Sequence, residues 1–285
     1  MIRYYKACIA GERHIEANIT CQDACHIVIR EDGIAFAACA DGVGSKRYAD
    51  IGARIATERS VEYCAVNHHT DAKPDDKLVI MREAFWEAFA DILAEAKTAN
   101  NPYDQYNTTL CLAIFDGDNL WYGQSGDSGL VVLKQNGEYI PVTQQQRDED
   151  GNVFPLRIGP TFWKIGKVDA PISGAMLMTD EVWDQIVPSL LRNEDVNINV
   201  ALAKKFMDRI EDEPTQIATL KAAAGEYLKN YPHLLPDDDK TIVVLYNPEK
   251  PARRLDEKYY APPDWYVLWE RAYRQLYGGE EAQEG

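Results

Sequence analysis

The stretch Ile34-Ala35-Phe36-Ala37-Ala38-Cys39-Ala40-Asp41-Gly42-Val43-Gly44-Ser45 joins an apolar run to a carboxylate and two glycines. The run predicts a buried strand that carries Asp41 at its tip, after which Gly42 and Gly44 bend the backbone. A carboxylate at the end of an apolar strand is costly unless a positive charge meets it. A metal ion, which the Gly42 carbonyl can also approach, is one answer. A simple hairpin turn is the other, because Asp-Gly is a common turn dipeptide.

Composition sets broad limits on the function. The chain has 285 residues, enough for one large domain or two modest ones, with 46% hydrophobic and 27% charged residues. The formal net charge of −16 argues against nucleic acid and anionic lipid as partners. The sequence shows neither a membrane-spanning run nor a signal-peptide apolar region, so we expect a cytoplasmic protein.

The cysteines fit the same compartment. None of the six forms a CxxC pair, so neither a zinc motif nor a disulfide framework is indicated. We expect reduced thiols in an intracellular protein. The six are Cys8, Cys21, Cys25, Cys39, Cys64 and Cys111.

The order of elements predicts antiparallel sheets layered with pairs of helices, an α+β fold, because strands do not alternate with single helices. The first 45 residues read as strands, with a hairpin between 26–30 and 34–40. Helices are expected over about 48–66 and 76–99, then a β-meander over 108–115, 120–124, 129–133 and 138–142. A strand over 174–179, helices over about 181–191, 200–210 and 214–229, and a last strand over 241–246 complete the pattern.

Two segments fall outside this pattern. The polar residues 143–168 predict a flap, because irregular segments of that length are often functional. After residue 250, an apolar stripe from Trp265 to Leu276 predicts a helix, which either packs on the domain or docks a partner. We therefore expect a domain over 1–250 and a C-terminal extension over 251–285, with one helix and an acidic tail. His68-His69 are expected in a solvated loop rather than in a metal site.

Four carboxylates share one context, because each lies at the end of an apolar strand. They are Asp41, Asp127, Asp180 and Asp238. Carboxylates that converge on one edge of a core stay ionised only with cations between them. Oxygen ligands without nearby His or Cys favour Mg²⁺ or Mn²⁺ over zinc.

Several short motifs occur together in a fixed order. They are Gly11…His14…Gln22-Asp23-Ala24, Asp41-Gly42-Val43-Gly44 continuing into Ile51-Gly52-Ala53-Arg54, Asn107-Thr108-Thr109, Gly126-Asp127-Ser128, Thr179-Asp180, and Asp238-Asp239-Lys240-Thr241. This set, spanning about residues 8–246, resembles the metal-dependent protein phosphatases, the type 2C serine/threonine phosphatases, and their bacterial branch most. The resemblance implies a four-layer α/β/β/α sandwich of two antiparallel sheets flanked by helix pairs, with a metal site at one edge.

The resemblance also implies ligands for two core ions, Mn²⁺ or Mg²⁺, and a weaker third. Asp41 would bridge the core ions and Gly42 would donate its carbonyl, while Asp180 and Asp238 complete one ion. Asp127 would hold the third ion with Asp180. Gln22, Asp23 and Asp239 would lie behind the ligands, with Gln22 acting through water.

The implied reaction is direct attack of a metal-activated water on phosphorus. A phosphoenzyme is not expected, because no cysteine begins a Cys-x5-Arg motif. Asp41, Asp127 and His14 would be catalytic, and Arg13 and His14 would bind phosphate. Val43 stands where some relatives carry a general-acid His, which directs attention to His14 as proton donor. A structural His14 in a strand is the alternative.

The expected protein is a phosphatase for phosphoserine and phosphothreonine on proteins, working with a cognate Ser/Thr kinase system. One alternative is a pseudophosphatase of the same fold that acts as a binding module. Another is a phosphoesterase for nucleotides or other small phosphates.

Overall fold

The computed structural model describes residues 1–69, 73–207, 217–230 and 237–277. Its helices are α1 (Glu12–Ala17), α2 (Ala49–Asn67), α3 (Pro74–Thr98), α4 (Asp180–Ile186), α5 (Val200–Met207), α6 (Ile217–Lys229) and α7 (Trp265–Tyr277). Its strands are β1 (Arg3–Ile9), β2 (Ala24–Ile29), β3 (Ala35–Ala40), β4 (Leu110–Phe115), β5 (Leu120–Ser125), β6 (Gly129–Lys134), β7 (Tyr139–Pro141), β8 (Lys164–Lys167), β9 (Ile172–Met178) and β10 (Lys240–Tyr246).

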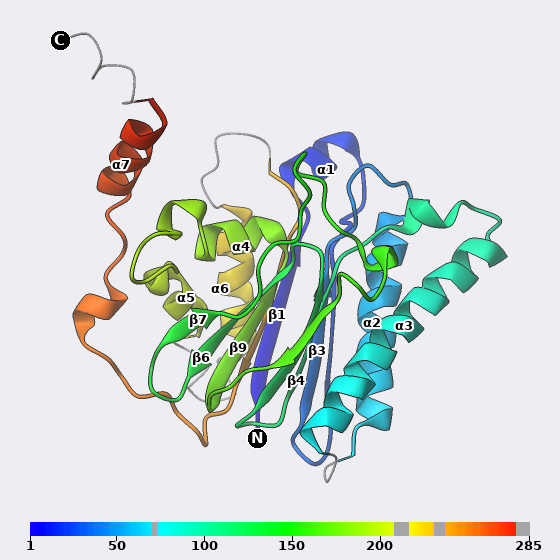
Figure 1. The fold of residues 1–285 in the computed structure, drawn as a ribbon, viewed down its shortest axis with the longest axis horizontal. Coiled ribbons are helices and arrows are strands. Elements are labelled where there is room, and N and C mark those ends of the chain that lie inside the picture. Colours follow the sequence, from blue (N-terminus) through cyan, green and yellow to red (C-terminus); the bar gives the residue numbers. More distant parts are fainter. Residues whose placement is uncertain (70–72, 208–216, 231–236, 278–285) are drawn as a thin grey trace.

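Two antiparallel sheets of five strands form the centre of the described part of the chain. Their strand orders are β1-β10-β9-β6-β7 and β2-β3-β4-β5-β8. Helices α2 and α3 cover the outer face of the second sheet, and α4, α5 and α6 cover that of the first (Figure 1). The protein is thus the predicted four-layer α+β sandwich.

Strand β3 is apolar throughout because both of its faces are covered. Ala35, Ala37 and Cys39 face the core between the two sheets. Phe36 and Ala38 face the helices on the other side. All six residues of the strand are buried, so the chain leaves the core only at Asp41.

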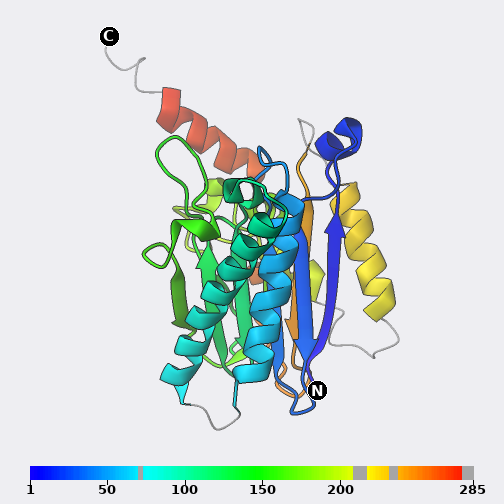
Figure 2. The ribbon, with the colours of Figure 1, turned by 90° about the vertical axis from the view of Figure 1, so that its right-hand side faces the viewer.

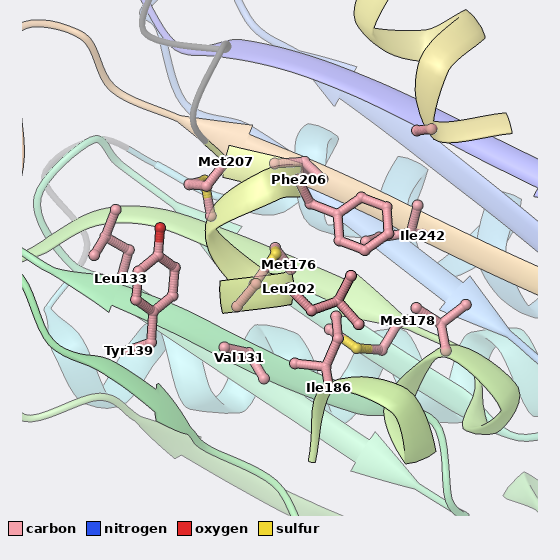
Figure 3. Close-up of a cluster of buried hydrophobic side chains, with 14 of the residues drawn as sticks. Val131, Leu133, Tyr139, Met176, Met178, Ile186, Leu202, Phe206, Met207 and Ile242 are labelled. Carbon is pink, nitrogen blue, oxygen red and sulfur yellow. The ribbon is translucent and has the colours of Figure 1, made fainter. Parts of the chain in front are cut away.

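The outer core of the first sheet fixes the position of α4. Figure 3 shows Met176 and Met178 of β9 packed with Ile186 of α4 and Phe206 of α5. Trp183 of α4 lies so close to β6 that a Cβ at Gly129 would come within 1.8 Å of its ring. Glycine at this position therefore lets α4, which begins at Asp180, lie directly on the sheet.

The expected β-meander is wrong. Strands β4 and β5 pair in one sheet, whereas β6 and β7 pair in the other. The chain changes sheets at Gly126-Asp127-Ser128, where Gly126 has φ +96°. Strand periodicity is the same in both sheets, so it could not show this crossing.

The first 45 residues were expected to form strands only, but they also contain a helix. Residues Glu12–Ala17 form α1, which ends at Asn18 in the left-handed conformation. His14 is therefore a helix residue, and the alternative of a strand histidine is wrong. Figure 2 shows α1 beyond the end of β1, at the opposite end of the strand from the N-terminus.

The predicted flap is anchored over part of its length. Leu156 and Trp163 are buried against the helices of the second sheet, and Lys164–Lys167 form β8 beside β5. The indole N–H of Trp163 donates a hydrogen bond to the Leu156 carbonyl (3.0 Å). Between Arg147 and Val153, which form an isolated bridge, residues 148–152 are exposed.

Helix α7 is present in the C-terminal extension, but most of its apolar stripe does not pack on the domain. Leu268 is its one buried residue, while Trp269 and Tyr273 are more than half exposed. Figures 1 and 2 show the helix projecting from the sandwich. The predicted acidic tail, and residues 208–210 and 214–216 of two predicted helices, lie outside the described residues.

One further expectation is corrected at the end of α2. His68 is 1% exposed, and its ring centroid lies 5.6 Å from that of Phe36. It is a core residue and not part of a solvated loop. None of the helices in the described ranges is long and apolar enough to span a membrane.

Candidate active site

The backbone of Asp41 is held by the Asn107-Thr108-Thr109 motif. The Asp41 N–H donates to the Thr109 hydroxyl oxygen (2.8 Å). The Asp41 carbonyl accepts from the Thr109 N–H (2.8 Å) and the Thr108 hydroxyl (2.9 Å). The Thr109 hydroxyl also lies 2.7 Å from that of Ser128. These contacts tie the tip of β3 to the crossing between the sheets and leave the Asp41 carboxylate free for other partners.

Gly42 is required by packing and not by a turn. A Cβ there would lie 2.7 Å from the carbonyl of Ala49 and 2.7 Å from that of Gln22. Its φ is outside the left-handed region, and β3 pairs with β2 and β4 rather than with the segment that follows it. The hairpin reading of Asp41-Gly42 is therefore wrong.

Three of the four predicted carboxylates converge. Oxygen atoms of Asp41, Asp127 and Asp180 lie within 4.8 Å of one another. Burial, followed by the charge of Asp180, raises the pKa of Asp41 well above its usual value. Burial, followed by the charge of Asp127, raises the pKa of Asp180 to about 7. The cluster thus favours any cation that can bind between its members.

Arg147 supplies a cation from the flap. Its Nη2 lies 2.7 Å from Asp127 Oδ2 and 2.8 Å from Asp180 Oδ2. The neighbouring Gln146 fixes the flap, since its side-chain oxygen accepts from the Gly126 N–H (2.9 Å) and its N–H donates to the Gly126 carbonyl (3.1 Å). Sequence reasoning missed Arg147, because nothing in the polar flap indicated which residue turns toward the carboxylates.

A second group forms where α1 meets the start of β10. Ligand atoms of His14, Asp238 and Asp239 lie within 4.8 Å of one another. His14 Nδ1 is 2.8 Å from Asp239 Oδ2 and 3.8 Å from Asp238 Oδ1. Arg13 Nη1 lies 3.6 Å from Asp238 Oδ2. The structure therefore places Asp238 with the predicted phosphate-binding residues, outside the group of three carboxylates.

Asp238 still acts on that group electrostatically. Its negative charge contributes to the raised pKa of both Asp41 and Asp180. The side chain is 43% exposed, whereas the Asp127 residue is 3% exposed. Asp238 thus lies at the open rim of the cluster.

Asp239 organises the backbone around it. Its Oδ1 accepts from the Gly11 N–H (2.9 Å), and its Oδ2 accepts from the Gln22 N–H. A Cβ at Gly11 would lie 2.4 Å from the Asp238 carbonyl oxygen, which explains why glycine begins this segment. Asp239 thereby connects α1, the Gln22 loop and β10.

Asp23 and Gln22 lie behind the strand tips. The Thr179 hydroxyl donates to Asp23 Oδ2 (2.8 Å) and accepts from the Thr241 N–H (2.9 Å). Asp23 is buried, and burial raises its pKa. Gln22 accepts at its carbonyl from the Gly42 N–H (3.1 Å), and its side-chain amide donates to the Lys46 carbonyl (3.2 Å).

Several buried oxygens in the described residues have no hydrogen-bond donor. Those of the candidate site include Asp127 Oδ1, Asp23 Oδ1 and Gln22 Oε1, and others lie elsewhere in the described residues. Buried polar atoms are rarely unpaired, so each indicates a missing donor, water or ion. An oxygen-rich set with raised carboxylate pKa values fits Mg²⁺ or Mn²⁺.

A comparison with protein-family models identifies the family of this chain. The family model described as protein phosphatase 2C matches residues 10–217. The chain belongs to this family. The membership confirms the class of enzyme expected from the motifs, a protein phosphatase 2C. A search of curated proteins found no match to the chain.

Solved structures share the fold at low sequence identity. Stp1 from Staphylococcus aureus is 12% identical, with 86% of this chain and 95% of that chain covered and a TM-score of 0.57. The S. agalactiae serine/threonine phosphatase is 14% identical, with coverages of 86% and 99% and a TM-score of 0.58. The catalytic domain of the phosphatase PstP, in complex with two manganese ions, is 17% identical, with coverages of 86% and 97% and a TM-score of 0.53.

Proposed function

We propose that this protein phosphatase 2C hydrolyses phosphoserine and phosphothreonine on proteins with the help of Mn²⁺ or Mg²⁺. The convergence of Asp41, Asp127 and Asp180 at the strand tips carries the proposal. Family membership and the manganese ions of the similar PstP domain support it. Its substrates would be the products of a Ser/Thr protein kinase.

Asp41, with the Gly42 carbonyl, Asp180 and Asp238, would hold the two core ions. Bound there, the ions would lower the pKa of a water and neutralise charge on the phosphoryl group. Asp127 and Asp180 would hold a weaker third ion where Arg147 now lies.

The protein's own side chains would receive the phosphate at the rim. Arg13 is exposed beside Asp238 and offers a planar fork of donors that suits phosphate oxygens. His14 Nδ1 lies 2.8 Å from Asp239 Oδ2, although not in hydrogen-bond geometry. Nε2 would therefore be the nitrogen that meets the substrate and transfers the proton.

The deciding experiment is hydrolysis of a panel of phosphoserine and phosphothreonine peptides with Mn²⁺, with Mg²⁺ and with a chelator. We expect phosphate release that depends on the metal and whose rate differs from one peptide to another. Activity on small phosphates alone would indicate the phosphoesterase alternative. Peptide binding without turnover under all metal conditions would indicate a pseudophosphatase.

His14→Ala should slow phosphothreonine peptides by roughly 10²-fold, the low end for general acid catalysis. An alkoxide leaving group needs a proton in the transition state, whereas an activated aryl leaving group hardly does. Aryl phosphate hydrolysis should therefore change much less, which steady-state kinetics on both substrates will measure.

His26→Ala is a suitable control, because His26 lies within β2, opposite Ala38 of β3, and belongs to neither group of candidate site residues. A pure phosphate contact would instead raise KM for both substrates alike. Unchanged peptide kinetics in His14→Ala would leave His14 with a structural role.

Arg147→Gln should tighten the weakest Mn²⁺ binding step by roughly tenfold, the low end of what a close charge does to a carboxylate. The guanidinium would no longer compete for Asp127 and Asp180. Isothermal titration with Mn²⁺ measures the change. Arg157→Gln, at an exposed site in the same segment, is the control, and equal affinities in the two variants would contradict the competition.

A further inference from the structure

A pair of thiols lies behind the active site. Cys8 Sγ in β1 and Cys21 Sγ in the loop after α1 are 3.5 Å apart. Cys8 is exposed and Cys21 is partly buried. Strand β1 is at the edge of its sheet and Cys21 is outside regular structure, so a small shift could bring the sulfurs to the bonding distance of about 2.05 Å.

The two thiols open into a cavity of about 470 Å³, the size of a small-molecule site. Lys6, Arg54 and Lys221 line it together with Asp23 and Asp50. Asp23 turns one oxygen to the Thr179 hydroxyl, and burial raises its pKa and so disfavours its charge. The cavity therefore presents more positive than negative charge and suits a small anionic molecule that reaches sulfur.

We propose that Cys8 and Cys21 are a redox-active pair, which a small carboxylate-bearing disulfide oxidises to an intramolecular disulfide. The Cys8 thiolate attacks one sulfur of that disulfide, whose S–S bond breaks and whose other half leaves as a thiolate. Cys21 then loses its proton to solvent and attacks the Cys8 sulfur, which displaces the second half. Two protein thiols lose two electrons, and the small disulfide is reduced to two thiols.

The contacts assign the order of attack. A hydrogen bond from Cys21 lowers the pKa of Cys8 to about 7, and the same contact raises the pKa of Cys21. The more exposed sulfur is thus also the better thiolate, as for attacking cysteines in general. Cys25 lines the same cavity, but burial raises its pKa to about 12.

Formation of the Cys8–Cys21 disulfide would affect the active site through the backbone that follows Cys21. Cys21 directly precedes Gln22, whose N–H is bound by Asp239 and whose carbonyl binds the Gly42 N–H. The Asp23 carbonyl faces both thiols, 3.7 Å from Cys8 Sγ and 3.9 Å from Cys21 Sγ. Pulling Cys21 toward β1 displaces this loop, so oxidation should lower phosphatase activity, a consequence that rests on the proposed function.

Glutathione disulfide is the probe. The reduced full-length protein is incubated with it over a range of glutathione redox ratios, quenched by alkylation, and mapped by mass spectrometry. We expect a Cys8–Cys21 linked peptide that dithiothreitol removes. Cys21→Ser should stop at a glutathione adduct on Cys8, and Cys8→Ser should form neither product, while Cys25→Ser should behave as the native chain.

Charge is tested separately. Lys221→Glu should slow oxidation by glutathione disulfide about tenfold, the low end of electrostatic effects on encounter rates, without slowing oxidation by the uncharged hydroxyethyl disulfide. A disulfide that involves Cys25, or no Cys8–Cys21 link at any redox ratio, would overturn the proposal. The covalent readout does not depend on phosphatase activity, so failure of the proposed function and failure of this inference are distinguishable.

Discussion

Asp41→Asn should lower kcat/KM on phosphothreonine peptides by about 10³-fold or more, the upper range for losing one preorganised electrostatic group. Asp41 is the carboxylate that would bridge the two core ions, and an amide cannot provide the same charge. Its backbone is held by Thr108 and Thr109, so the fold should survive. Mn²⁺ affinity, measured by isothermal titration, should fall with activity.

The same variant should be more heat-stable than the native chain when metal is removed. The folded-state pKa of Asp41 is raised, so its ionised form costs stability above the unfolded pKa of about 3.9, and the cost is absent below it. At pH 7 the neutral amide removes that cost. Asp75→Asn, the same change at an exposed site, is the control, and native Mn²⁺ affinity in Asp41→Asn would sink the ligand assignment.

Asp127→Ala should lower turnover by roughly 10²- to 10³-fold while two Mn²⁺ ions still bind. Asp127 lies in the same cluster as Asp41, but in the proposed site it would hold only the weaker third ion, for which its unpaired Oδ1 is available. Metal stoichiometry from titration and kcat on the peptide panel together test this. Loss of both core ions would show that Asp127 is part of the core site.

Arg147 complicates the single variant, because removing Asp127 leaves the guanidinium beside Asp180 alone. The double variant Asp127→Ala with Arg147→Gln separates the two effects. If activity is lost through the missing carboxylate, the double variant stays as inactive as Asp127→Ala. Recovery of activity in the double variant would instead show that Arg147, left beside Asp180 alone, causes the loss of activity in Asp127→Ala.

The sequence predicted those features that depend on neighbouring residues in the chain, such as a buried strand and the carboxylate at its end. The order of the elements predicted the layered fold, and the carboxylates at strand ends predicted a convergence that holds for Asp41, Asp127 and Asp180 but not for Asp238. A carboxylate at a strand tip is a local feature, and the order of the motifs added the family's architecture.

The rest depended on long-range packing. Alternation along β6 is the same in either sheet, so the crossing at Gly126 could not be predicted. Helix α1 is only six residues long, too short for a periodic signal. The apolar stripe of α7 predicted either packing on the domain or docking of a partner. Its aromatic face is largely exposed, because periodicity shows that an apolar face exists without showing what covers it.

The core between the sheets has a consequence for ion selectivity. Asp41 stands on one sheet and Asp180 on the other, so the thickness of the sandwich sets how far apart the two carboxylates sit. That thickness is set in part by small side chains such as Ala37, Ala113 and Ala175. Magnesium requires ligand distances of about 2.0–2.1 Å, whereas calcium accepts about 2.3–2.6 Å. In the proposed metal site these buried methyl groups would act as a spacer, and a larger residue at Ala37 should change the separation of Asp41 and Asp180 and with it the preferred cation.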